Sequence, residues 1–208
     1  MGIALALVVA FAQWKGWLPE DHPSGSGKKP QTIPAPPTGN LPPSGEWQEL
    51  AGCTLVEDRD NDGDSFQVLY QGARYTLRLY FADCAEKRVT QLTRERVAEQ
   101  GKYFGGLSEE ATVKAGERGR DFTLPRLRAA PFMVMTRWEK VFGGPRIYGF
   151  VTVADGDLAE LLVREGLARI HTKGVDRPGG GTSRAEKEKL TALETAARKA
   201  RRGAWGMR

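Results

Sequence analysis

Several acidic residues and one arginine lie close together in one stretch of the chain. Asp62 and Asp64 belong to an Asp-Gly-Asp-Ser run, Asp83 and Glu86 belong to an Asp-Cys-Ala-Glu run, and Arg78 lies between the two. Acidic residues are poor strand formers, so several of them at the ends of strands indicate a site. Carboxylate oxygens bind hard cations such as calcium, a further carboxylate can act as a general base, and a guanidinium can bind phosphate through two hydrogen bonds. Together these residue types indicate phosphodiester hydrolysis.

A β-hairpin is expected to position these residues. Apolar residues alternate over residues 66–70, a Gln-Gly turn follows at 71–72, and residues 75–81 alternate again. Successive side chains of a strand point to opposite faces, so Arg78 is predicted to lie opposite the apolar set, where it can face a ligand. The alternative interpretation is a surface arginine without a role.

Other patterns predict three more strands and about three helices. The strands are expected at residues 50–57, 132–138 and 147–153. The helices are expected at residues 108–122, 158–165 and 190–200. The glycine-rich residues 97–106 are expected to form a loop, either a mobile rim or a plain connection. These elements predict an α+β, mainly β, fold: a five-stranded OB-fold Greek-key barrel with about three helices.

The spacing of the acidic residues and the arginine resembles the staphylococcal nuclease (thermonuclease) family. The pattern of that family is Asp-Gly-Asp-Thr, then Arg, then Asp-Thr-Pro-Glu. Asp64, Arg78 and Asp83 follow one another at the distances that this pattern requires, without a gap. A lone Asp-Gly-Asp-Ser run is weak evidence, but the spaced set is much more specific.

The resemblance continues to the end of the chain. Arg146 begins a segment that looks like the strand with the second arginine of the family. Residues 155–168 resemble its Asp-Gly pair and following Leu-Val-Arg-Gln-Gly-Leu-Ala segment, and residues 203–206 resemble its closing tryptophan segment. The resemblance covers roughly residues 47–208 and implies the same barrel fold.

The resemblance also implies a metal ion and its ligands. Family members are calcium-dependent, sugar-nonspecific nucleases that cleave the P–O5′ bond of DNA and RNA, leave 3′-phosphate ends and favour single-stranded or fraying sites. Here Asp64 and Asp83 would ligate Ca²⁺ through their carboxylates, and Cys84 through its backbone carbonyl. Asp62 would support the site through water or added charge.

The catalytic roles are carried over in the same way. Glu86 would orient or deprotonate the attacking water. Arg78 and Arg146 would hold the scissile phosphate and stabilise the charge that builds up on its oxygens.

Departures from the family pattern leave other functions open. Cys84 and Ala85 replace Thr-Pro, the alignment at Arg146 needs a one-residue shift, and residues 171–173 lack the family's nucleotide-stacking tyrosines. One alternative is a catalytically weakened domain of this family that binds nucleic acid or protein. Another is a scaffold domain whose barrel groove binds peptides or sugars.

The remaining features concern the partners and destination of the protein. The formal net charge of +5 suits an anionic partner. Residues 1–18 are predicted to be a signal peptide or an N-terminal membrane anchor, with a buried helix as the alternative, and residues 19–46 a Pro/Gly-rich disordered linker. We therefore expect an exported monomer, either secreted, periplasmic or membrane-anchored. If so, Cys53 and Cys84 either pair or remain free thiols.

Overall fold

The computed structural model describes residues 43–142 and 144–207. The predicted signal peptide or anchor at 1–18, and the predicted linker up to residue 42, lie outside the described residues. The predicted nuclease-like region, 47–208, lies almost entirely inside them.

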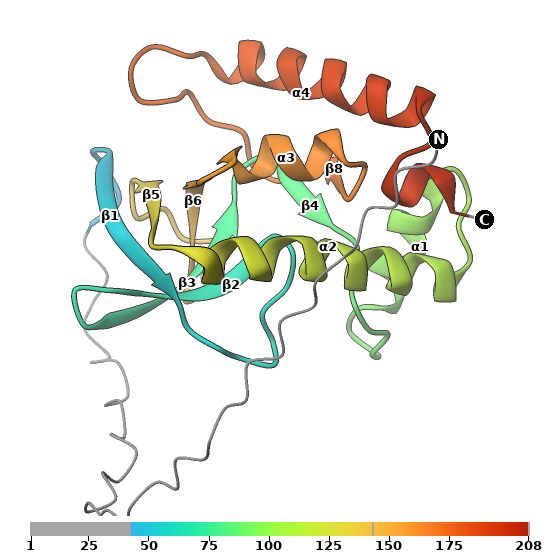
Figure 1. Cartoon of the computed structure of the whole chain (residues 1–208), viewed down its shortest axis with the longest axis horizontal. Helices are drawn as coiled ribbons and strands as arrows, with labels where there is room; N and C mark the ends of the chain where they lie inside the picture. Colours follow the sequence, from blue (N-terminus) through green and yellow to red (C-terminus); the bar gives the residue numbers. More distant parts are fainter. Residues whose placement is uncertain (1–42, 143, 208) are drawn as a thin grey trace, which may run out of the picture. The chain divides into compact units, whose positions relative to one another are not determined.

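Five strands close into a barrel, as the sequence predicts. Strands β1 (Gln48–Leu55), β2 (Ser65–Tyr70) and β3 (Ala73–Leu79) form an antiparallel meander. Strand β5 (Phe132–Thr136) pairs with β1, and β6 (Arg146–Val153) pairs with β5. The parallel pairing of β3 with β6 closes the ring (Figure 1). The predicted α+β class with an OB-fold-like five-stranded barrel is confirmed.

The barrel core comes from the apolar positions that alternate along these strands. Because every second side chain points inward, the alternation of the sequence becomes one packed interior. The fully buried members of the strands include Phe66, Val68, Leu77, Leu79, Val134 and Ile147. Burial of each such side chain contributes on the order of 2 kcal/mol, so the barrel is a stable frame for the residues at its strand ends.

Short strands lie outside the barrel. Strands β4 (Ala82–Cys84) and β8 (Ala168–Ile170) form an antiparallel pair, and Asp83 lies opposite Arg169 in its register. The two-residue strand β7 (Gly156–Asp157) pairs with the end of β6. The β4–β8 pair therefore brings together two charged residues that are far apart in the sequence.

The described residues form four α-helices, compared with the about three that the sequence predicts. Helices α2 (Glu109–Ala129), α3 (Leu158–Arg164) and α4 (Ser183–Lys199) correspond to the three predicted ones, and η1 (Gly203–Gly206) is a short 3₁₀ helix. Each predicted helix begins at a side chain that accepts a backbone N–H: Ser108, Asp157 and Thr182. Figure 1 shows α4 lying along α3.

Helix α1 (Arg94–Tyr103) is the additional helix, and it corrects the prediction of a loop at residues 97–106. Its first residue follows Thr93, which makes no side-chain capping hydrogen bond. Its buried face includes Val97, Gln100 and Gly101, so two of these three residues are not apolar. The segment therefore lacks the apolar stripe that would have predicted the helix.

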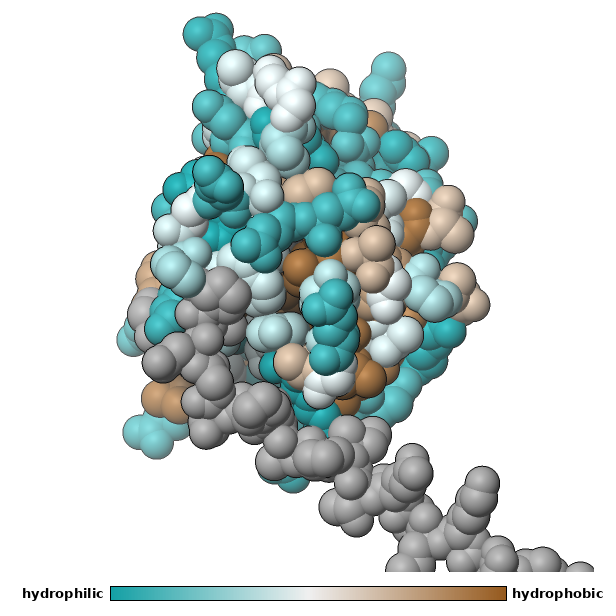
Figure 2. Space-filling model, turned by 90° about the vertical axis from the view of Figure 1, so that its left-hand side faces the viewer, coloured by the Kyte–Doolittle hydropathy of each residue, from teal (hydrophilic) through white to brown (hydrophobic). Residues whose placement is uncertain are grey.

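The exposed surface of the described residues is mainly polar. On the face shown in Figure 2, hydrophilic side chains surround a smaller hydrophobic area. Among the described large hydrophobic residues, Leu92 and Phe142 stand out because each is 95% exposed. In residues 43–142 and 144–207, no helix combines the length and the apolar character needed to cross a bilayer.

Candidate active site

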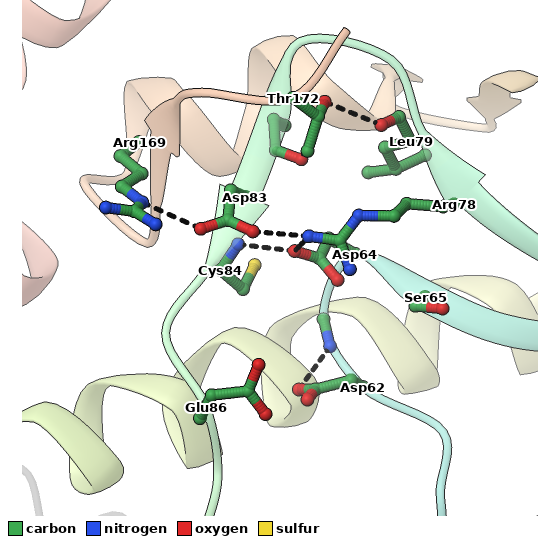
Figure 3. Close-up of polar contacts among 12 residues, drawn as sticks. Asp62, Asp64, Ser65, Arg78, Leu79, Asp83, Cys84, Glu86, Arg169 and Thr172 are labelled. Carbon is green, nitrogen blue, oxygen red and sulfur yellow. Dashed lines mark hydrogen bonds and ion pairs between the residues drawn. The ribbon is translucent and has the colours of Figure 1, made fainter. Parts of the chain in front are cut away.

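The predicted acidic residues and Arg78 meet where strands β2, β3 and β4 come together (Figure 3). Asp64 immediately precedes β2, and its carbonyl accepts a hydrogen bond from the Leu79 amide at 2.9 Å. Its carboxylate accepts a second one from the Cys84 amide, at 2.6 Å, and lies 3.5 Å from the Arg78 guanidinium. Two predicted metal ligands, Asp64 and Cys84, and the predicted phosphate ligand Arg78 thus lie together.

Asp83 is the most heavily paired member of this cluster. Its side chain is buried, and both carboxylate oxygens accept hydrogen bonds. Oδ1 accepts from Arg78 and, at 2.6 Å, from Arg96. Oδ2 accepts from Arg169 at 2.7 Å and from Gln100 at 3.1 Å. Three guanidinium groups therefore surround a single carboxylate.

The acidic side chains differ in their protonation equilibria. Burial alone would raise the pKa of Asp83, but Arg96, Arg78 and Arg169 lower it to about 2. Burial raises the pKa of Asp64, against the opposing charge of Arg78. Burial and the charge of Asp64 raise the pKa of Asp62 to about 7. Asp83 is therefore ionised at neutral pH, whereas burial disfavours the ionised forms of Asp62 and Asp64.

Glu86 follows β4 and lies on the side of the cluster nearer α2. Its carboxylate is 2.8 Å from Nη1 of Arg96, and its amide donates to Gln100 at 2.9 Å. Figure 3 shows Glu86 and Asp62 pointing toward each other. Helix α2 approaches closely here, because a Cβ at Gly116 would lie only 2.6 Å from the carbonyl carbon of Glu86. Glycine at this position therefore allows the helix to pack against the segment that carries Glu86.

A pocket of about 730 Å³ opens beside this cluster. Its lining includes Asp83 and a set of basic side chains: Arg78, Arg96, Lys140, Arg146 and Arg169. Lys173 also lines the pocket, as do three further acidic residues, Glu95, Glu99 and Glu139. Basic side chains still outnumber acidic ones in the lining, so the pocket suits an anionic group.

Arg146 begins β6 and lies opposite Thr76 in the parallel register with β3. Burial and the nearby charge of Arg78 lower the pKa of Arg146. The two predicted phosphate-binding arginines thus line one pocket. Glu86, Asp62 and Asp64 do not line it.

The donor chemistry fits a calcium ion, although the present arrangement is not that of a formed cation site. Carboxylate and carbonyl oxygens are the ligands that calcium prefers, and Asp64, Asp83 and Cys84 would supply them. Within the part of the chain that the structure describes, no three His, Cys, Asp or Glu side chains are arranged to hold a metal ion. The oxygens of Asp83 are paired with basic groups, and the Cys84 carbonyl accepts from Gln100 at 3.0 Å. Some of these contacts must open before an ion can bind.

Three residues of the site were not predicted from the sequence. Arg96 and Gln100 come from α1, and Arg169 comes from β8. Arg96 and Gln100 are four positions apart and so share a helix face, a signal that becomes usable only once the segment is read as a helix. Arg169 could not be found from spacing, because the β4–β8 pairing alone brings it to Asp83.

The two cysteines do not pair. Cys53 and Cys84 are both buried free thiols, and Cys53 donates to the Leu50 carbonyl at 3.3 Å. Burial raises the pKa of both thiols. Of the two possibilities that the sequence left open, the structure has the free thiols.

Comparison of the chain with models of known protein families gives no match, and comparison with curated proteins gives no significant match. The family resemblance therefore depends on the motifs and on the barrel that carries them.

Proposed function

We propose that this protein is a calcium-dependent, sugar-nonspecific nuclease that hydrolyses phosphodiester bonds of DNA and RNA and leaves 3′-phosphate ends. The observation that carries the proposal is the cluster of Asp64, Asp83 and Arg78 beside a pocket lined by basic side chains. A polyanionic strand complements such a pocket, and hydrolysis requires the oxygen ligands and the base that lie next to it.

The proposed roles follow from these positions. Arg78 and Arg146, which line the same pocket, bind the scissile phosphate and stabilise the charge on its oxygens. Glu86 orients or deprotonates the attacking water. A calcium ion held by Asp64, Asp83 and the Cys84 carbonyl, with Asp62 in support, would supply Lewis-acid polarisation of a phosphoryl oxygen.

Two exposed apolar side chains favour a strand with unpaired bases. Leu92 and Phe142 are each 95% exposed, and both line the basic pocket. An aromatic ring beside basic groups suits a nucleotide, because bases stack on rings while phosphates contact cations. Phe142 would thus provide a stacking surface that residues 171–173 lack. We propose single-stranded or fraying DNA and RNA as partners of a monomeric protein that is exported or anchored through residues 1–18.

The test is cleavage of single-stranded DNA and RNA by the purified full chain, first with calcium and then with a chelator. We expect cleavage only with calcium, and Glu86→Gln should lower turnover about 10²- to 10⁴-fold because it removes the base. Glu99→Gln is the matched control, since Glu99 is exposed and lines the same pocket. It should retain turnover within about twofold.

The alternative function predicts a different result. A catalytically weakened domain would bind single-stranded nucleic acid but cleave neither substrate with any divalent cation. Absence of cleavage by a folded protein, or equal activity of Glu86→Gln and Glu99→Gln, would refute the nuclease assignment.

A further inference from the structure

Arg96 occupies an unusual position among the arginines of the site. One guanidinium nitrogen lies 2.6 Å from the Asp83 carboxylate, and another lies 2.8 Å from the Glu86 carboxylate. The same side chain lines the basic pocket, whereas Glu86 does not. Arg96 therefore bridges a proposed metal ligand and the proposed general base, and it lies between that base and the pocket.

Arg96 is also the most exposed of the three arginines that surround Asp83. Its side chain is 35% exposed, compared with 7% for Arg78 and 4% for Arg169. Arg169 is held in strand register with Asp83, and Arg78 is a buried residue of the barrel strand β3. A long side chain on a helix surface can change rotamer at far lower cost than these two. Of the three arginines, Arg96 is therefore the one whose side chain can most easily move away from Asp83.

We propose that Arg96 is an internal counter-cation of the calcium site, which the incoming divalent ion displaces from Asp83 and Glu86. This inference rests on the proposed function. A carboxylate has about four acceptor positions, and those of Asp83 already take four donors: Arg78, Arg96, Arg169 and Gln100. An ion that binds Asp83 therefore displaces one of these donors. Displacement also frees Glu86 to contact water.

The displaced guanidinium of Arg96 can move into the basic pocket. Arg96 already lines the pocket together with Arg146 and Lys140, so a rotamer change moves its charge toward the position proposed for the phosphate strand. Arginine can bind a phosphate through two parallel hydrogen bonds. Calcium binding and strand binding then each favour the same position of Arg96, which makes them mutually reinforcing.

The test is the calcium affinity of the full chain, measured by isothermal titration calorimetry in the absence of nucleic acid. We expect Arg96→Gln to lower the calcium Kd at least tenfold, because the ion no longer has to displace a cation. Arg94→Gln is the matched control: it removes the same charge from the same helix, but Arg94 is 69% exposed and lies 3.7 Å from Glu109. Its calcium Kd should stay within twofold of wild type.

A second measurement uses the unaltered protein. The Nη–H signals of Arg96 in ¹⁵N NMR, whose nitrogens contact Asp83 and Glu86, should shift and lose their protection from exchange when calcium replaces chelator. The Nε–H signal of Arg169, which donates to Asp83, should persist. Circular dichroism checks that the variants are folded.

Other outcomes overturn the inference. An Arg96→Gln affinity equal to that of Arg94→Gln or weaker than wild type, an unchanged Arg96 signal, or no calcium binding by any of the proteins would each do so. Calcium-dependent cleavage by wild type with no tighter binding in Arg96→Gln would refute the displacement and leave the nuclease standing. Tighter calcium binding by Arg96→Gln, without cleavage by wild type, would refute the nuclease and leave the displacement standing.

Discussion

Two clusters of charged side chains in this protein have opposite charge arrangements. In the candidate site, one carboxylate, Asp83, is surrounded by three guanidinium groups. In the other cluster, one guanidinium is surrounded by three carboxylates: Arg177 lies 2.9 Å from Asp157, 2.7 Å from Glu186 and 3.9 Å from Glu160.

The difference between the clusters lies in what they connect. Asp157 caps the start of α3, and Glu186 lies in the first turn of α4, so Arg177 fastens the two helix starts together. Its guanidinium also lies 4.1 Å from the centre of the Phe150 ring. In the candidate site, Asp83 and its three arginines instead line a pocket of about 730 Å³. A cluster whose charges connect two helices indicates a structural role, and one whose charged side chains line a cavity indicates a ligand.

The largest effect should come from Arg78. Arg78→Gln should lower nuclease turnover about 10³-fold, because it removes a donor aimed at the developing phosphate charge. Arg78→Lys keeps the buried charge but loses the planar fork, so it should also lose most activity while remaining folded. Steady-state cleavage of single-stranded DNA measures both.

Arg177→Gln is the matched substitution in the other cluster. At a temperature where it is folded, we expect its turnover to stay within about threefold of wild type. Equal loss of turnover in Arg78→Lys and Arg177→Gln would remove the functional difference between the two clusters.

Stability should respond in the opposite way. Arg177→Gln leaves Asp157, Glu160 and Glu186 without their shared cation and should lower the free energy of unfolding by about 3 kcal/mol or more. Urea unfolding followed by circular dichroism would measure this. A loss below about 1 kcal/mol would mean that Arg177 does not fasten α3 to α4, and that the cluster needs another explanation.

The sequence predicted the barrel strands and part of the Asp83 cluster, but not the Arg177 cluster. Alternating apolar residues predicted the five strands, because a barrel interior imposes a two-residue period on the strands that enclose it. The carboxylates and Arg78 were predicted because they lie close along one hairpin. Arg169 and Arg177 were not predicted, because long-range packing alone brings them to their partners.

Helix α1 was missed for a different reason. Most residues of the segment are good helix formers, but Gly101 within it and the glycines that follow it favoured the prediction of a loop. Tertiary contacts add to the local preference: Gln100 is buried and binds Asp83, the Cys84 carbonyl and the Glu86 amide. The site therefore stabilises the helix that carries Arg96 through contacts that local sequence does not reveal.

The smallest effect is a difference in pH dependence between the two clusters. Arginine charges lower the pKa of Asp83 from its ordinary 3.8 to about 2, whereas burial raises the pKa of Asp157 despite Arg177. The unfolded chain therefore binds a proton at Asp83 before the folded protein does. The stability from Asp83, about 2 kcal/mol, is present above pH 4 and is lost as the pH falls toward 2. The contribution of Asp157 to the pH dependence of stability has the opposite sign. The folded protein binds a proton at Asp157 before the unfolded chain does, so protonation there adds stability as the pH falls.

Urea unfolding in chelator between pH 2.5 and pH 6 would separate the two contributions. Asp83→Asn should make stability fall less steeply toward low pH than in wild type, and Asp157→Asn, which keeps a good helix cap, should make it fall more steeply. The slopes carry the information, since each substitution also shifts stability at every pH. If both variants changed the slope in the same direction, the excess of guanidinium groups around Asp83 would not control its protonation. The electrostatic distinction between a site that holds charge for a ligand and one that neutralises charge between helices would then fail.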